Sequence, residues 1–371
     1  MVRAVSREDE RRIMSDVSVS RLRPVRLWLL AAAAMIFLTL VVGGATRLTE
    51  SGLSITEWKP VTGVMPPLSQ AAWQAEFDGY KQIPQYRELN KGMSLDQFKT
   101  IYWWEWTHRL LARTVGMVFL LPFLFFLWRG LIPGPLKLRL WSIFAGGAAL
   151  GVVGWWMVSS GLAGSDRVSV SQYRLAFHLT LACAIFAAIL WTAQQLRPQA
   201  RRDMPARLRI GASAIMWLVL LQIYLGALVA GSGAGLAYNT WPLIDGSFIP
   251  SAGGLLHMTP AWRNVFENIL TIQFDHRMIA YTIWVIAVLH AIDAVRTGRR
   301  TAGALTVALL VTAQAALGIV TLLYQVALPL ALSHQMFAIV VFTAAIVHAE
   351  QMSHRREALA APRAVTVEQG A

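Results

Sequence analysis

Long apolar segments constrain this chain more strongly than any other feature of its sequence. Hydrophobic residues make up 56% of the 371 residues, charged residues only 14%, and the mean hydropathy is +0.50. A helix that crosses a membrane needs about 20 mostly apolar residues. Eight segments meet this condition, namely 27–46, 109–128, 140–160, 174–194, 209–230, 277–295, 302–324 and 332–350.

These segments are continuously apolar and do not alternate between apolar and polar residues. Only helices and closed barrels satisfy every backbone polar group in lipid. Barrel strands alternate, whereas membrane helices are apolar throughout. We therefore predict an all-α polytopic membrane protein with eight transmembrane helices.

Basic residues lie at alternate ends of the predicted spans. A net charge of +13 would by itself suggest nucleic-acid binding. The cations, however, cluster before the first span, between spans two and three, between four and five, and after six and eight. This is the positive-inside pattern with both termini cytoplasmic, and it argues against a nucleic-acid partner. Because Glu8, Asp9 and Glu10 are not typical of a mitochondrial transit peptide, we expect a bacterial inner (plasma) membrane protein.

The second half of the chain repeats features of the first. Segment 226–242 mirrors 43–60 in its glycines, tryptophan and proline, and 272–280 mirrors 101–113 in its His-Arg pair. Four spans per repeat is an even number, so the halves run parallel. We predict two duplicated four-helix bundles. The predicted division is a partly disordered cytoplasmic tail (1–26), an N-terminal bundle (27–195), a C-terminal bundle (209–350) and a second cytoplasmic tail (351–371).

The longest outer loop spans residues 47–104. Apolar residues recur at helical spacing over 69–81, and Ser94-x-x-Gln97 resembles a capping box. We therefore predict two short helices on the outer surface. The tryptophans that follow either anchor the membrane interface or stack on a flat ligand: Trp103, Trp104 and Trp106.

Four of the eight histidines occupy equivalent positions, each at the outer end of an even-numbered span: His108, His178, His276 and His334. Each bundle thus offers two histidines at matching depth, the arrangement that axial ligation of a haem iron requires. Zinc usually takes four protein ligands, and copper or non-haem iron needs a further ligand that does not repeat here. Cys183, the only cysteine, excludes a thiolate cluster. We interpret the histidines without a counterpart in the other half as loop, interface or tail residues: His257, His290, His348 and His354.

Arginines accompany these histidines. Arg109, Arg113 and Arg277 lie just inside helices that carry a histidine, and Arg174 precedes His178 by one turn. Arginine pairs well with carboxylates such as the propionates of haem. The alternative is an ordinary interfacial role.

An acid distinguishes the two halves. Glu105 lies one turn before His108 and four residues before Arg109, and Gln273 stands in the corresponding place of the second half. A carboxylate can take up or release a proton, whereas an amide cannot. The first-half site therefore suits chemistry and the second suits a redox centre, unless Glu105 and Arg109 form an ion pair that merely orients the helix.

Segment 43–60, the run Glu105-x-x-His108-Arg109 and the four equivalent histidines closely resemble the haem A synthase family, over residues 25–350. The resemblance implies an oxidoreductase that converts the C8 methyl of haem O into the formyl of haem A by successive hydroxylations, for terminal oxidases. It also implies roles for single residues. Glu105 would be catalytic; His108, His178, Arg109 and Arg113 would bind the substrate haem; His276, His334 and Arg277 would hold a resident haem b.

The resemblance further implies partners and placement. A haem O synthase would supply the substrate, a ferredoxin-like donor would supply electrons, and the haem sites would face the periplasm. A homo-oligomer is one alternative for the assembly. Some relatives have a cysteine pair in the first outer loop, and this chain has none there.

Rival functions explain part of the pattern. A di-haem b-type electron-transfer protein accounts for four histidines but not for a single glutamate. A haem carrier or oxidase assembly factor without catalysis is a second rival, and conversion of bound haem O would discriminate against both. A secondary transporter is least compatible, since its polar residues usually lie at the bilayer midplane.

Overall fold

The structure is a computed structural model that describes residues 7–197 and 204–353, with side chains from residue 22. Regular structure in this part of the chain is helical, and eight helices are long and apolar enough to cross a membrane. These helices are α1 (Arg7–Leu48), α4 (Leu95–Trp128), α5 (Gly134–Val158), α6 (Gln172–Gln195), α7 (Ala206–Ser232), α11 (Ile269–Thr297), α12 (Thr301–Leu323) and α13 (Leu328–Met352). The predicted all-α class and the eight spans are confirmed.

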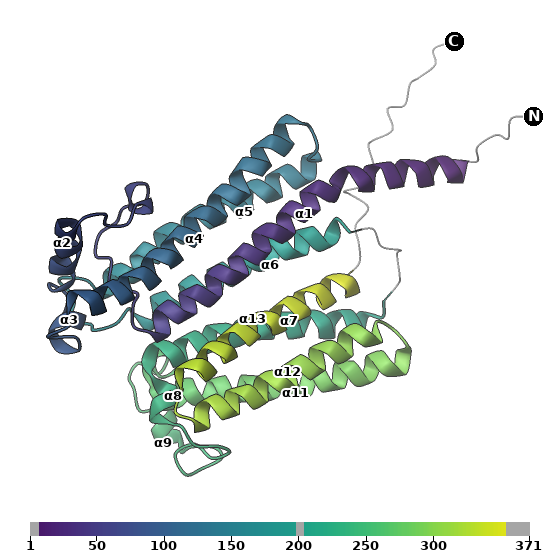
Figure 1. Cartoon of the computed structure of the whole chain (residues 1–371). Helices are drawn as coiled ribbons and strands as arrows, with labels where there is room; N and C mark the ends of the chain where they lie inside the picture. Colours follow the sequence, from purple (N-terminus) through teal and green to yellow (C-terminus); the bar gives the residue numbers. More distant parts are fainter. Residues whose placement is uncertain (1–6, 198–203, 354–371) are drawn as a thin grey trace, which may run out of the picture.

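The eight helices pack as two rings of four (Figure 1). In the first ring, α1 contacts α4 and α6, and α5 contacts the same two helices. In the second ring, α7 contacts α11 and α13, and α12 contacts the same two. The two rings thus have the same packing order along the chain, as a duplicated unit requires.

The rings meet along α1, α6, α7 and α13. The side-chain amide of Gln335 on α13 donates to the carbonyl of Leu40 on α1 over 3.0 Å. A methyl group at Gly44 would lie 2.0 Å from that amide, so only glycine permits this approach. Arg47 adds a second connection, since its guanidinium donates to the carbonyl of Ala230 over 3.1 Å.

Short helices gather at one end of the molecule. Figure 1 shows α2 (Gln70–Tyr80) and α3 (Pro84–Glu88) at the same end as α8 (Ala234–Ala237) and α9 (Ala252–Leu255). The described ends of α1 and α13, at Arg7 and Met352, lie toward the opposite end. The remaining short elements are 3₁₀ turns at Thr62–Val64 and Ser159–Gly161, and α10 (Arg263–Glu267).

A satellite core fixes the first outer loop onto α4. Tyr80 and Phe98 are fully buried there, and Ile83 is almost as well buried. Burial of each such side chain stabilises the loop by about 1.5–3 kcal/mol. The Tyr80 hydroxyl donates to Gln85, whose amide donates to the carbonyl of Glu50 over 3.0 Å. The loop is therefore a folded cap rather than a loose connection.

Three local expectations need correction. The capping box at Ser94 is present, but the helix that it starts continues into the membrane as α4, because no proline or glycine interrupts residues 95–109. The short helix α3 was not expected, although Pro84 at its first turn is a usual start signal. Helix α1 begins at Arg7, so residues 7–26 are not an irregular tail; residues 1–6 and 354–371 lie outside the described part.

Candidate functional site

Each of the four equivalent histidines lies against a glycine of the neighbouring helix in its ring. A methyl group added to that glycine would lie only 2.6 to 3.2 Å from the imidazole Cε1, closer than ordinary van der Waals contact. Glycine leaves room for the ring and for a flat group beside it. The four pairs are Gly43 with His108, Gly154 with His178, Gly226 with His276, and Gly318 with His334.

The two histidines of each ring lie on opposite helices of that ring, His108 on α4 and His178 on α6, and His276 on α11 and His334 on α13. The Nδ1 atom of His178 is buried without a hydrogen-bond partner. An unsatisfied buried nitrogen costs roughly 1–3 kcal/mol, and this cost disappears when a ligand accepts its lone pair. Two imidazoles on opposite helices of a four-helix ring, each beside a glycine, fit the axial ligands of a haem iron.

Glutamine side chains lie against the two outer histidines of the second ring. The Gln222 Nε2 lies 3.1 Å from Nδ1 and 3.2 Å from Nε2 of His276. Gln314 makes the same contact with Nδ1 of His334, at 3.1 Å. Both glutamines stand four residues before the glycine that faces the histidine, where the first ring has Thr39 and Leu150. The sequence reasoning missed both glutamines, although their spacing to the glycines is a usable signal.

The Glu105 carboxylate is buried, with 2% of the residue exposed, and accepts four hydrogen bonds. Its Oε2 accepts from the Ser54 hydroxyl and from the backbone N–H of Ile55, both over 2.8 Å. Its Oε1 accepts twice from Arg109, over 3.1 and 2.5 Å. These donors fill the acceptor sites of a carboxylate. The Glu105–Arg109 ion pair, the alternative role of Glu105, is thus present within α4, and the bonds from Ser54 and Ile55 to the same carboxylate attach the outer loop to that helix.

Both predicted substrate-site arginines also bind this loop. Arg109 donates to the carbonyl of Ile55 over 2.9 Å, and Arg113 donates to the carbonyls of Lys59 and Pro60 over 2.7 and 2.9 Å. The Nη1 atom of Arg113 is buried and has no hydrogen-bond partner. The arginines therefore shape the loop and leave one donor for an anion.

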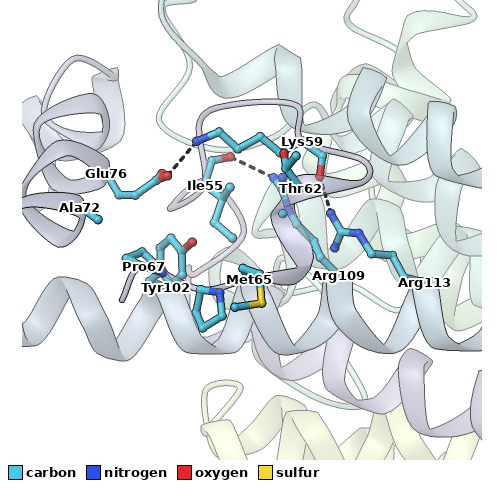
Figure 2. A pocket seen from close by; sticks show the side chains of 12 residues that line it. Ile55, Lys59, Thr62, Met65, Pro67, Ala72, Glu76, Tyr102, Arg109 and Arg113 are labelled. Atoms are coloured by element: carbon cyan, nitrogen blue, oxygen red, sulfur yellow. Dashed lines mark hydrogen bonds and ion pairs between the residues drawn. The ribbon is translucent and has the colours of Figure 1, made fainter. Parts of the chain in front are cut away.

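Figure 2 shows the cavity that this arrangement encloses, of about 280 Å³. Arg109 and Arg113 reach into it from α4, and Lys59 crosses it to Glu76 over 3.0 Å. Neither histidine of the first ring is among its lining residues. Of the three cations that line the cavity, Lys59 pairs with Glu76 and Arg109 with Glu105, whereas Arg113 keeps an unpaired donor that favours an anionic group.

The second ring repeats the loop attachment with weaker contacts. Arg277 donates to the carbonyls of Tyr238 and Leu243 over 3.1 and 3.2 Å. Gln273 donates to the Tyr238 carbonyl over 3.4 Å, and its Oε1 is buried without a partner. The second ring thus has the same arginine, with an amide in place of the Glu105 carboxylate.

The other predicted residues have structural contacts. Arg174 donates to the carbonyl of Trp156 over 2.6 Å and lies 4.6 Å from the centre of that indole ring, so it caps α5. Trp103 and Trp104 are exposed, and Trp103 also packs edge-on against Trp73. An interfacial position suits both tryptophans.

The interpretation of His290 and His348 was wrong. Both are buried, with 6% and 3% exposed, and their Nε2 atoms lie 2.8 Å apart. They belong to α11 and α13, the helices that carry His276 and His334. His257 is an exposed loop residue as predicted, and His354 lies outside the described residues.

Comparison with known proteins identifies the family of this chain. The family model of COX15-CtaA, described as cytochrome oxidase assembly protein, matches residues 26–346. This chain belongs to that family. It is 58% identical to the haem A synthase of Bradyrhizobium diazoefficiens, over 94% of this chain and 96% of the relative. It is 59% identical to that of Rhodopseudomonas palustris strain TIE-1 (89% and 90%) and 57% identical to that of Azorhizobium caulinodans (91% and 96%).

Proposed function

We propose that this chain is a haem A synthase, a membrane oxidoreductase that oxidises the C8 methyl of haem O to the formyl of haem A. Its similarity to relatives of that name extends over most of both chains. The observation that carries the proposal is the set of four histidines in two rings, each against a glycine, together with the buried Glu105 carboxylate one turn before His108, where the second ring has Gln273.

The first ring, within 27–195, is proposed as the substrate half. His108 and His178 would receive the iron of haem O, because they lie on opposite helices of the ring, each beside a glycine. The spare Nη1 donor of Arg113 and the cation-lined cavity would hold a propionate. Arg109 would fix the loop over the substrate rather than bind it directly, since its donors already contact Glu105 and the loop.

Glu105 is proposed as the group that holds or releases a proton near the reacting methyl. It lies one turn before His108, and it is the member of the Glu105–Gln273 pair that can titrate. The Ser54 hydroxyl on Oε2 provides a hydrogen-bonded contact through which a proton can leave. The four donors also keep the carboxylate at a fixed position.

The second ring, within 209–350, is proposed as the holder of a resident haem b. His276 and His334 would ligate its iron, and the buried, unpaired Nε of Arg277 would meet a propionate. When bound, this group supplies one-electron chemistry. Gln222 and Gln314 would then donate to the histidine carbonyls, as they do here over 3.0 Å, and fix the imidazole orientation.

The proposal also implies the protein partners of the chain and the side of the membrane on which the haem sites lie. The bis-histidine sites would lie toward the periplasm, with the basic loops in the cytoplasm. A haem O synthase would supply the substrate through the bilayer, and a ferredoxin-like protein would supply electrons. The outer loop with its buried core would cover the substrate site.

Haem analysis tests the proposal. The chain is expressed together with a haem O synthase, and the extracted haems are separated by chromatography with mass detection. We expect haem A or its hydroxylated precursor, absent from a vector control. Haem B and haem O alone, from a folded preparation supplied with a donor, would favour an electron-transfer or carrier function instead.

A further inference from the structure

A second histidine pair lies deeper in the second ring. His290 on α11 and His348 on α13 point their Nε2 atoms at each other over 2.8 Å, with ring centres 5.1 Å apart. The Nδ1 atom of His348 is buried without a hydrogen-bond partner. The proposed activity uses neither residue.

This pair repeats the pattern of the outer pair. His290 and His348 each follow the outer histidine of their helix by fourteen residues. Fourteen residues are close to four helical turns, which places the second pair on nearly the same face about 21 Å deeper.

Glycines repeat in the same register. A methyl group at Gly211 on α7 would lie 2.8 Å from Nδ1 of His290, and one at Gly303 on α12 would lie 2.6 Å from Nδ1 of His348. These glycines precede Gly226 and Gly318, which face the outer histidines, by fifteen residues each. Both layers of the second ring thus have one histidine on α11, one on α13 and a glycine beside each.

The helix frame does not itself require histidines at this depth. In the first ring the corresponding positions are occupied by Pro122 and Thr192, and Trp28 stands where Gly211 stands. Trp28 packs there against Phe119 and other aromatic rings. An apolar filling is therefore compatible with the same four-helix packing, and the buried histidine pair needs a separate explanation.

Cations lie at the mouth of the deeper layer. Arg207 stands one turn before Gly211 and pairs with Asp293 over 2.7 Å, and Arg300 stands three residues before Gly303. Arginines at the membrane edge suit the propionates of a haem whose ring lies inside the bundle.

We propose that His290 and His348 form a second bis-histidine site in the second ring, which binds the iron of a noncovalently held b-type haem. A chain with a single cysteine has no C-x-x-C-H attachment site. Iron would replace the hydrogen bond between the two Nε2 atoms, which must then separate to about 4 Å, since each metal–imidazole bond is about 2 Å long. The bound group would lie between the basic ends of the spans and the outer pair.

Counting haem in the purified full-length chain tests this site. Haem b per polypeptide is measured by pyridine haemochrome and amino-acid analysis in the wild type, in His348→Ala and in the control His257→Ala. We expect His348→Ala to lose one haem b per polypeptide, and the exposed-loop control to lose none. Equal haem content in all three would overturn the site and leave a purely structural histidine pair.

A second variant keeps the test decisive if His348→Ala does not fold. His348→Met retains an axial ligand, and His/Met ligation raises the reduction potential of a haem relative to bis-histidine ligation. A redox titration should then show one haem b at a higher potential and the others unchanged. Unchanged potentials for every haem would contradict the proposal.

The outcome is independent of the proposed activity, because haem A formation is scored separately. A chain that loses one haem b in His348→Ala but never forms haem A would support this site and refute the synthase. If the chain forms haem A and His348→Ala keeps the wild-type haem b content, the synthase proposal is supported and the His290–His348 site is refuted.

Discussion

The outer sites of the two rings share one frame and differ in one functional group. In both, an arginine that follows the histidine donates to carbonyls of the adjoining loop. Glu105 accepts four hydrogen bonds in the first ring, whereas Gln273 makes one long hydrogen bond in the second and leaves its Oε1 unpaired. The comparison teaches that the two rings place equivalent histidines and arginines alike, while the position four residues before the arginine has a carboxylate in one ring and an amide in the other.

At the deeper level it is the second ring, and not the first, that has additional polar groups. The first ring is filled there by aromatic side chains around Trp28, and the second contains the His290–His348 pair. The first ring is thus specialised at its outer end and packed below. The second has histidines on α11 and α13 at two depths, which is the basis of its proposed role as the holder of haem groups.

Removal of the Glu105 charge should have the largest effect. Glu105→Gln keeps the size of the side chain but cannot take up a proton. We expect haem A formation to fall by about 10²–10⁴-fold, the usual contribution of a positioned acid or base. The resident haem b spectrum should stay unchanged. The matched control Gln273→Ala should retain most activity, and full activity in Glu105→Gln would remove Glu105 from the chemistry.

Loss of Arg109 should mainly cost stability. Arg109→Gln leaves the buried Glu105 carboxylate without its partner, and breaking a buried pair costs about 3–5 kcal/mol. Thermal unfolding in detergent should show a lower midpoint, and trypsin should cut the 47–104 loop faster. Arg277→Gln, the second-ring counterpart, should leave cleavage of that loop unchanged. Equal protection of the loop in Arg109→Gln would show that the arginine does not anchor it.

Replacing the glycines beside the histidines with alanine should have different effects in the two rings. Gly43→Ala places a methyl 2.6 Å from the His108 ring, and such overpacking costs typically about 1–3 kcal/mol. We expect haem A formation to fall roughly 5–150-fold, on that range, with the haem b spectrum intact. Gly226→Ala should instead alter the haem b spectrum. Gly116→Ala, whose methyl meets no atom within 4 Å, is the control, and an equal loss there would refute the steric account.

The smallest effect concerns Lys59 in the outer loop. Its hydrogen bond to Glu57, with a further contribution from Glu76, raises the pKa of Lys59 above its ordinary value. A raised pKa means that the stabilisation is complete below the ordinary pKa and disappears only as the pH rises through the raised one. Lys59→Met should therefore lower stability by about 0–1 kcal/mol, equally at pH 6 and pH 9. A difference that changes between these two pH values would contradict this assignment.

The sequence predicted the spans and the outer histidines because both depend on local signals. Apolar runs long enough to cross a bilayer have few alternatives to helices. The duplication then supplied the equivalence of His108 and His276. The helix at 69–81 was also predictable, and α2 occupies Gln70–Tyr80.

What the sequence did not predict depends on contacts between helices. His290 and His348 have no counterpart in the first half, so the duplication gave no reason to pair them, although both stand fourteen residues after an outer histidine. The role of Arg113 as an anchor of loop carbonyls requires knowledge of how the loop folds back over α4. The sequence did not predict that α4 begins as early as Leu95, because its surface part and its membrane part join without a proline or glycine between them.

The most direct test of the division between the halves compares two double variants in one haem analysis, with haem O synthase coexpressed. His108→Ala/His178→Ala should keep the resident haem b and form no haem A. His276→Ala/His334→Ala should lose the outer resident haem b. Haem A formed by the first double variant, or the same loss of haem b in both, would contradict the assignment of substrate to the first ring and of the resident haem to the second.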